Sequence, residues 1–242
     1  MHDWAYMQSS AIRILGVFTL FQTALLILSP PARAATSGLN NIPTADTVPH
    51  LTLVLQEYST FGARRPPDHT AGFKFGIDPW ETSAWRNRFE VGMDGHFAPS
   101  DAGPAVFHAK FTTQPHASGP ALGLGVVNLA ATRDDRDRTG QPLSYAVLSQ
   151  DLTWFRLHAG YGVQAENNHT ALLGIDKTIK LFNRDLMLRA DAVQIERQHN
   201  WAASLGGVYS FGKYFAFESW VTQPIHRHPP SFTMKFNVIF RF

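Results

Sequence analysis

The sequence contains no cysteine among its 242 residues. Neither a disulfide framework nor a thiolate metal site can therefore form. The glycine-rich phosphate loop, the H-E-x-x-H zinc motif and the G-x-S-x-G nucleophile elbow are missing as well. Charge of one sign is not in excess, because 21 Lys and Arg residues nearly balance 19 Asp and Glu residues. That balance argues against a nucleic-acid partner, and nothing in the sequence indicates a cofactor.

Only one apolar run near the start of the chain approaches the length of a membrane helix. Residues 14–28 follow Arg13 and precede the small-residue pattern Ala32, Arg33, Ala34. This order predicts a signal peptide over residues 1–34, cleaved after Ala34. The alternative is a retained transmembrane helix, but the run is shorter than the roughly 20 residues that a span needs. No later stretch is long enough, so we expect any membrane insertion to be by strands.

Residues 231–242 alternate between apolar and polar side chains, and only Ile239 breaks the polar series. The apolar positions are Phe232, Met234, Phe236, Val238, Phe240 and Phe242, and the polar ones include Thr233, Lys235, Asn237 and Arg241. Because side chains on a strand alternate between two faces, one face meets an oily environment and the other a wet one. This is the pattern of a transmembrane β-strand. The final phenylalanine also looks like the end of the strand that the barrel-assembly machinery recognises, which makes that machinery an expected partner.

Eleven further alternating segments precede this one, separated by turn-forming residues. They are 51–60, 69–78, 87–97, 105–113, 121–129, 143–150, 152–163, 170–179, 185–196, 201–211 and 214–223. Twelve is an even number, and most segments have the length that a tilted strand needs to cross a bilayer. We therefore predict an all-β protein, a single antiparallel transmembrane β-barrel of about twelve strands over residues 50–242, in the bacterial outer membrane. Residues 35–49 are expected to be a periplasmic lead, and both termini are expected in the periplasm, with lipids and lipopolysaccharide around the barrel.

Parity along the segments predicts which charged residues line the lumen. They are Lys74, Glu90, Asp94, Lys110, Arg156, His158, Asp176, Arg189, Asp191, Lys235 and Arg241. One interpretation is a narrow polar pore whose charges select solutes. The other is a salt-bridged filling that braces a closed structural or adhesive barrel. Twelve strands fall between barrels that side chains fill and barrels that hold an open channel, so both interpretations stay open.

Three further groups of residues were considered as functional sites. The charged run 133–138 could bind calcium or lipid phosphates, and His226 with His228 could share a metal, but an ordinary solvated loop is the simpler expectation for each. An outer-membrane lipid or ester hydrolase would need a base and an acid, which His158 with Asp176 or His169 with Glu166 could supply. No serine in a recognisable nucleophile context accompanies either pair, so we expect no enzyme and no bound metal.

One stretch of sequence resembles a known group of proteins. Residues 38–46 (GLNNIPTAD), followed by Pro49 and an alternating segment, resemble the opening of YjbH-type outer-membrane proteins, which are associated with exopolysaccharide export. Residues 123–126 (GLGV) and 156–162 (RLHAGYG) are similar to barrel strands of that group. The resemblance implies a β-barrel linked to polysaccharide secretion, with polysaccharide as a partner and no established catalytic residues.

Overall fold

The computed structural model describes residues 37–62, 67–81, 86–98, 101–116, 118–132, 141–164, 168–195, 200–225 and 229–242. These residues form twelve strands: β1 (Thr52–Gly62), β2 (Asp68–Glu81), β3 (Arg86–Ala98), β4 (Asp101–Gln114), β5 (Ala121–Ala130), β6 (Leu143–Asp151), β7 (Arg156–Gln164), β8 (Asn168–Leu181), β9 (Arg184–Ile195), β10 (Asn200–Ser210), β11 (Phe215–Pro224) and β12 (Ser231–Arg241). The predicted signal peptide, residues 1–34, lies outside the described residues.

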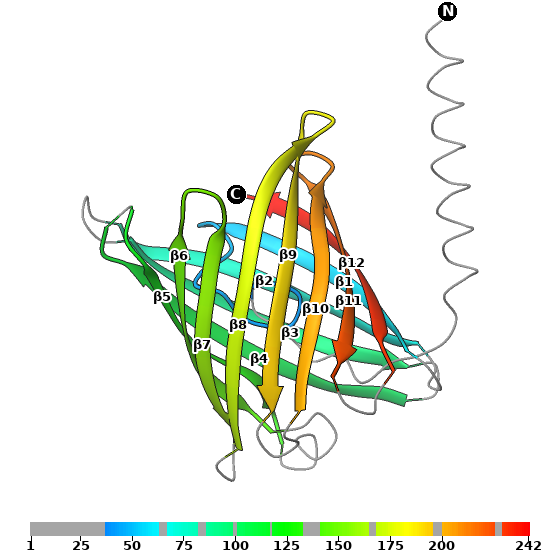
Figure 1. Ribbon diagram of the computed structural model, residues 1–242. Coiled ribbons are helices and arrows are strands. Elements are labelled where there is room, and N and C mark those ends of the chain that lie inside the picture. The colour runs from blue at the N-terminus through cyan, green and yellow to red at the C-terminus, as the bar shows by residue number, and fades with distance from the viewer. Residues whose placement is uncertain are drawn as a thin grey trace, which may run out of the picture.

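The strands close into one antiparallel barrel (Figure 1). Each strand pairs with its neighbours in the chain, and β1 pairs with β12 from Thr52↔Arg241 to Gly62↔Ser231. Closure leaves no unpaired strand edge, which is what a sheet in hydrocarbon requires. The predicted fold class and strand number are confirmed.

Several predicted strand boundaries differ from the structure by one to four residues, and one of these differences moves a turn. Segment 152–163 was expected to be a strand throughout, with the preceding turn at residues 150–151, but β7 begins only at Arg156. Residues 152–155 form the connection instead, and the N–H of Leu152 donates to the carbonyl of Phe155 at 2.9 Å. The apolar residues Leu152, Trp154 and Phe155 read as strand by periodicity, yet they are exposed in this turn.

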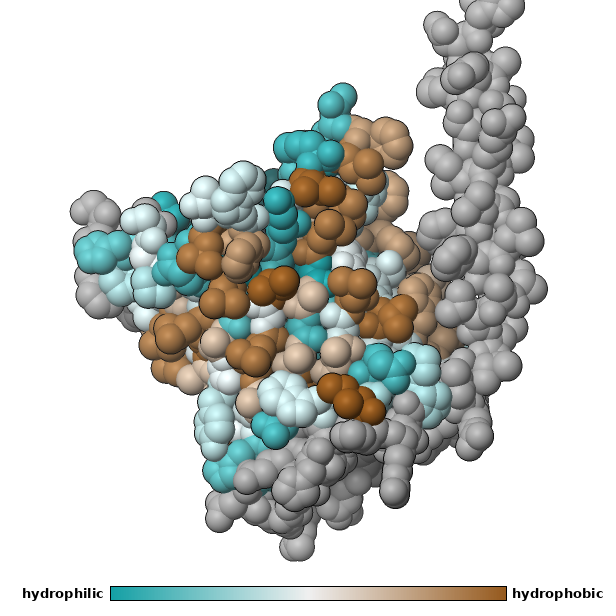
Figure 2. All heavy atoms as spheres, viewed as in Figure 1, coloured by the Kyte–Doolittle hydropathy of each residue, from teal (hydrophilic) through white to brown (hydrophobic). Residues whose placement is uncertain are grey.

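The outer wall of the barrel is apolar. Exposed large apolar side chains alternate with buried residues around the whole barrel, among them Leu55, Val91, Phe107, Leu124, Leu148, Leu173, Leu188 and Phe236. Figure 2 shows that apolar residues gather across the middle of the visible face, with hydrophilic residues more common toward both ends. A closed β-wall with this exterior is stable only in a lipid bilayer. The predicted location in the bacterial outer membrane is confirmed.

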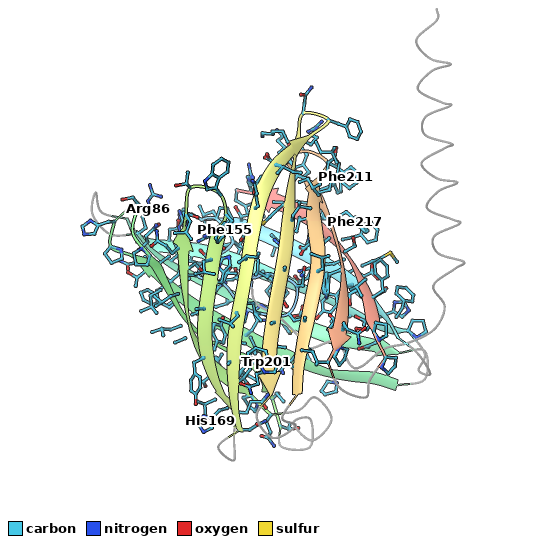
Figure 3. All side chains as sticks on the ribbon, in the orientation of Figure 1. Arg86, Phe155, His169, Trp201, Phe211 and Phe217 are labelled. Atoms are coloured by element: carbon cyan, nitrogen blue, oxygen red, sulfur yellow. The ribbon has the colours of Figure 1, made fainter. Side chains whose placement is uncertain are left out.

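The two ends of the barrel differ in their connections. We call the end that carries residues 152–155, 182–183 and 211–214 the turn end, and the opposite end, where β5 ends and β6 begins, the loop end. The β8–β9 turn consists of Phe182 and Asn183, both with positive φ, as a two-residue hairpin turn requires. Aromatic side chains lie near both ends: Figure 3 places Phe155 and Phe211 toward the turn end and Trp201 toward the loop end. The described residues include no helix that is long and apolar enough to cross a membrane.

Candidate functional site: an occupied lumen

The most informative feature of the structure is a segment inside the barrel. Residues 37–50, which we call the plug, precede β1 and contact inward-facing side chains of nine strands, from β3 around to β11. Residues 35–49 were predicted to be a polar periplasmic lead, and contacts inside the lumen were not predicted for them. The same stretch carries the resemblance to YjbH-type proteins.

The plug contains a tight hairpin. Gly38 and Pro43 form an isolated antiparallel bridge, and the N–H of Leu39 donates to the carbonyl of Ile42 at 3.0 Å. A Cβ atom on Gly38 would lie 2.2 Å from that carbonyl oxygen, so only glycine fits at this close approach. The turn directs Leu39 and Ile42 toward the wall on one side and Asn40 and Asn41 on the other.

Two wall residues bind the ends of the plug near β3 and β4. The Glu90 carboxylate accepts the N–H groups of Ser37 and Val48, each at 2.8 Å. The Lys110 ammonium group donates to the carbonyl oxygens of Ser37 at 2.6 Å and Thr44 at 3.3 Å. Both wall side chains are buried, so the backbone of the plug supplies partners that would otherwise have to be water.

A second carboxylate binds the tip of the hairpin. Asp191 on β9 accepts the N–H groups of Asn40 at 2.8 Å and Asn41 at 3.1 Å. The side-chain amide of Asn41 donates to Ser204 on β10 and, at 2.9 Å, to Thr222 on β11. The tip therefore crosses the lumen and is bound on the side opposite β4 to β6.

The apolar side of the plug packs on a lumenal patch of the wall. We call this patch the apolar seat; it consists of Val127 on β5, Tyr145 and Val147 on β6, and Leu172 on β8. Leu39 and Ile42 complete the same buried cluster. These wall residues occupy inward positions, where a water-filled lumen would favour polar side chains.

Gly174 on β8 makes room for the plug. A Cβ atom there would lie 2.3 Å from Cδ1 of Leu39 and 2.9 Å from Cδ1 of Ile42. The missing side chain thus lets two apolar side chains of the plug approach the backbone of the wall. Wall and plug are matched in shape as well as in polarity.

Three wall residues form a hydrogen-bonded relay that ends on the plug. The N–H of Ala45 donates to Oγ of Ser149 at 2.9 Å, Oγ lies 2.8 Å from Nδ1 of His158, and Nε2 of His158 lies 2.8 Å from Oδ2 of Asp176. When Asp176 is ionised and His158 is neutral, Nε2–H donates to Asp176 and the Ser149 hydroxyl donates to Nδ1, because a carboxylate only accepts and a neutral imidazole has one donor nitrogen and one acceptor nitrogen. His158 and Asp176 were predicted from the sequence as a possible base and acid, but Ser149 was not predicted to join them. Its position opposite His158 in the β6–β7 register supplies the missing link.

An ion pair adjoins the relay. Nη1 of Arg156 lies 2.5 Å from Oδ1 of Asp46 in the plug, and Nε of Arg156 lies 3.0 Å from Asp151. Burial alone would raise the pKa of Asp46, but the charge and hydrogen bond of Arg156, with a further hydrogen bond from Thr44, outweigh it and lower this pKa below its ordinary value. Asp46 is therefore an anion bound to Arg156 at neutral pH.

The remaining predicted lumen residues lie mostly on the wall away from the plug. Glu218 accepts from Arg189 at 2.9 Å and from Asn237 at 2.7 Å, and Lys235 lies 3.5 Å from it. Asp94 accepts from Gln56 at 2.6 Å, and Lys74 is buried on the neighbouring strand. Arg241, by contrast, is exposed at the turn end. The structure thus places these charges inside the barrel except at its rim; that they line a conducting pore stays a prediction.

The other candidate sites of the sequence analysis receive less support. Run 133–138, Glu166, His226 and His228 lie outside the described residues. His169 is hydrogen-bonded to the outward-facing Tyr161, so it does not point into the lumen. Among the residues that the structure describes, no group of three or more His, Asp or Glu side chains is placed to hold a metal ion.

The fold is that of known outer-membrane barrels. No protein-family model and no curated protein matches the sequence. The COG4313 outer membrane channel from Pseudomonas putida F1 is 9% identical with a TM-score of 0.54, over 81% of this chain and 98% of that one. The KdgM porin is 7% identical with a TM-score of 0.52, over 78% and 99%, and the outer membrane phospholipase A from Escherichia coli is 9% identical with a TM-score of 0.50, over 78% and 92%. At these identities the likeness concerns the fold alone.

Proposed function

We propose that this protein is a gated outer-membrane channel and that the structure represents its closed state. Displacement of the plug into solvent opens the lumen. One observation carries the proposal: the plug is bound to the wall by wall side chains and hardly at all by strand pairing. Its one described backbone bridge to the wall is His50↔Gly76, at the point where β1 begins. A segment bound in this way can leave while every ladder of the barrel remains intact.

When the plug leaves the lumen, water or a solute can replace it as the hydrogen-bond partner of each polar wall residue. Glu90, Lys110 and Asp191 are ionisable side chains that water or a passing solute can bind in place of backbone groups. The hinge remains anchored, because Leu51 donates to the carbonyl of Gly76 at 3.0 Å and His50 accepts the N–H of Asp78 at 2.9 Å. The plug therefore moves as a tethered segment about residues 49–51.

The solutes proposed for the open channel are small anionic molecules. Lys110, Arg156, Arg189, Lys235 and Arg241 attract negative charge along the wall, while Glu90, Asp94 and Asp191 keep it hydrated. Acidic saccharides belong to this class, and the resemblance to exopolysaccharide-associated proteins supports them as one example. The terminal strand β12, with Phe242 exposed at its end, is proposed to be recognised by the assembly machinery.

Planar-bilayer recordings of the purified protein test the gate. We expect the full chain to be closed for most of the time and a variant lacking residues 37–48 to conduct continuously. Adding a synthetic peptide of residues 37–49 should block that variant again, because the wall contacts need no covalent link. Replacing Arg156 or Arg189 with Ala in the deletion variant should reduce its anion selectivity. A deletion variant that assembles into a barrel but never conducts would refute the proposal.

A second candidate function, ester hydrolysis, is favoured by the Ser149–His158–Asp176 relay. Oγ of Ser149 would attack an acyl carbonyl carbon while Nδ1 of His158 takes the Oγ proton, and the proton would then pass to the departing alkoxide as its C–O bond breaks. Water would hydrolyse the resulting acyl-serine. In the described state Ser149 is buried and its Oγ accepts the N–H of Ala45, so the plug must leave first.

Labelling with a fluorophosphonate separates this second candidate from a purely structural relay. Labelling of Ser149 in the deletion variant, lost in His158→Ala, would support hydrolysis. The absence of labelling in a deletion variant that conducts would leave the relay with one role, which is to bind the plug.

A further inference from the structure

The plug combines two chemical features that the lumen recognises together. Leu39 and Ile42 fill the apolar seat, and Asp46 presents a carboxylate to Arg156. Apolar groups and an anion thus occupy matched parts of one wall. The plug in this respect acts as a ligand that is covalently attached to its own binding site.

The two parts of this site lie at different depths of the lumen. On β8 the inward positions are Leu172 in the seat, then Gly174, then Asp176, and Arg156 lies directly opposite Asp176 in the β7–β8 register. Four residues of strand separate Leu172 from Asp176, which corresponds to about 13 Å. A molecule that bridges both parts must therefore carry an extended apolar portion.

Polar solutes cannot replace every contact of the plug. Water or a sugar can bind Glu90, Lys110 and Asp191, but neither can cover Val147 and Leu172 as Leu39 and Ile42 do. A solute with an apolar chain and a terminal anion can do both. Its carboxylate would bind Arg156 beside Asp151 and Asp176, the same surroundings in which the carboxylate of Asp46 already lies.

We propose that the lumen contains a binding site for amphipathic monocarboxylates, molecules with an alkyl or aryl chain that ends in one carboxylate. Such a molecule occupies the apolar seat and Arg156 in place of the plug and so opens the channel. This inference rests on the proposed gating function and identifies the solute class that triggers it.

The absence of native cysteine makes displacement of the plug directly measurable. In the full chain carrying Ala45→Cys, the thiol is buried under the closed plug, and the substitution keeps the N–H that binds Ser149. We expect decanoate, added below its micelle concentration, to raise the rate of labelling by a membrane-impermeant maleimide several-fold. Decanol at the same concentration tests the chain without the charge, and acetate and glucose test a charge or hydroxyl groups without the chain; none of the three should raise the rate. Val48→Cys reports on the same segment if the first variant does not assemble.

The ratio of labelling rates with and without decanoate identifies the site. Arg156→Gln should bring this ratio close to one even if its basal labelling is higher. An equal effect of decanol and decanoate, or a ratio unchanged in Arg156→Gln, would overturn the inference. A deletion variant that conducts, combined with no effect of decanoate on the full chain, would overturn the solute class and leave the gate intact. A deletion variant that does not conduct would overturn the gate itself.

Discussion

Truncating Ile42 tests whether the apolar seat keeps the channel closed. Ile42 is 1% exposed in the docked plug, and its side chain packs in the buried cluster of the apolar seat. An Ile→Ala change in a buried cluster costs about 2–5 kcal/mol. We take about 3 kcal/mol, because a plug of irregular backbone can partly collapse into the gap. At about 1.4 kcal/mol per factor of ten, Ile42→Ala should lower the docking equilibrium constant about a hundred-fold.

Single-channel recordings measure this change as the ratio of open to closed time. Ile175→Ala is the matched control, since it makes the same substitution on the outward face of β8, where the side chain is 45% exposed to lipid. We expect the control to gate like the native protein and Ile42→Ala to be open far more often. Heat-modifiable gel migration would show that both barrels are assembled. An unchanged open probability in an assembled Ile42→Ala barrel would refute the claim that the seat carries the closed state.

Three further predictions address other contacts of the plug. Gly174→Val should raise the open probability, because a Cβ atom there would lie 2.3 Å from Cδ1 of Leu39; recordings in which this variant stays closed would contradict the close fit. Ser149→Ala leaves the N–H of Ala45 without its acceptor, which costs about 1–3 kcal/mol and should raise the ratio of open to closed time by about five-fold or more, whereas Ser219→Ala on the outer face should change nothing. The lowered pKa of Asp46 means that its contribution to docking is present above the ordinary pKa of 3.8 and is lost as pH falls through the still lower docked value. The difference in open probability between the native protein and Asp46→Asn should therefore be constant from neutral pH down to about 4 and shrink below it, because only the native protein loses the Asp46 contribution; a difference that shrinks at higher pH would refute the assignment to Asp46.

The barrel could be predicted from the sequence because its cause is local. A strand shows one face to lipid and one to the lumen, so Phe73 and Phe75 alternate with Lys74 and Gly76 whatever the rest of the chain does. The strand pairing follows from short connections between neighbours. The one misplaced turn, at residues 152–155, arose where an interfacial turn uses the same apolar residues as a membrane strand.

The plug could not be predicted from residues 37–50 alone. Its sequence has neither strand nor helix periodicity, and its partners on the wall are 26 to 181 residues away in the chain. A weaker signal was present in the wall: Val127, Tyr145, Val147 and Leu172 are apolar at inward positions. Apolar side chains at these inward positions indicate that an apolar group, such as a segment of the chain, fills this part of the lumen. The serine of the relay was missed because its role depends on strand register and not on a local motif.

The two walls of the lumen have different consequences for gating. A barrel of twelve strands is wider than the eight-stranded barrels that side chains just fill, and in this structure the plug occupies part of the interior. We call the part of the wall that carries Glu90, Lys110 and Asp191 the charged wall. Water can replace each plug contact there, so docking of the plug on the charged wall contributes little free energy to the closed state. On the apolar wall, opening exposes Val147 and Leu172 to water with no compensating partner. The free energy that favours the closed state must then come mainly from the seat, while the charged groups determine which solute enters. A mutation in the apolar seat should therefore change mainly the open probability, and a mutation of Lys235, which pairs with Glu218, should change mainly the selectivity.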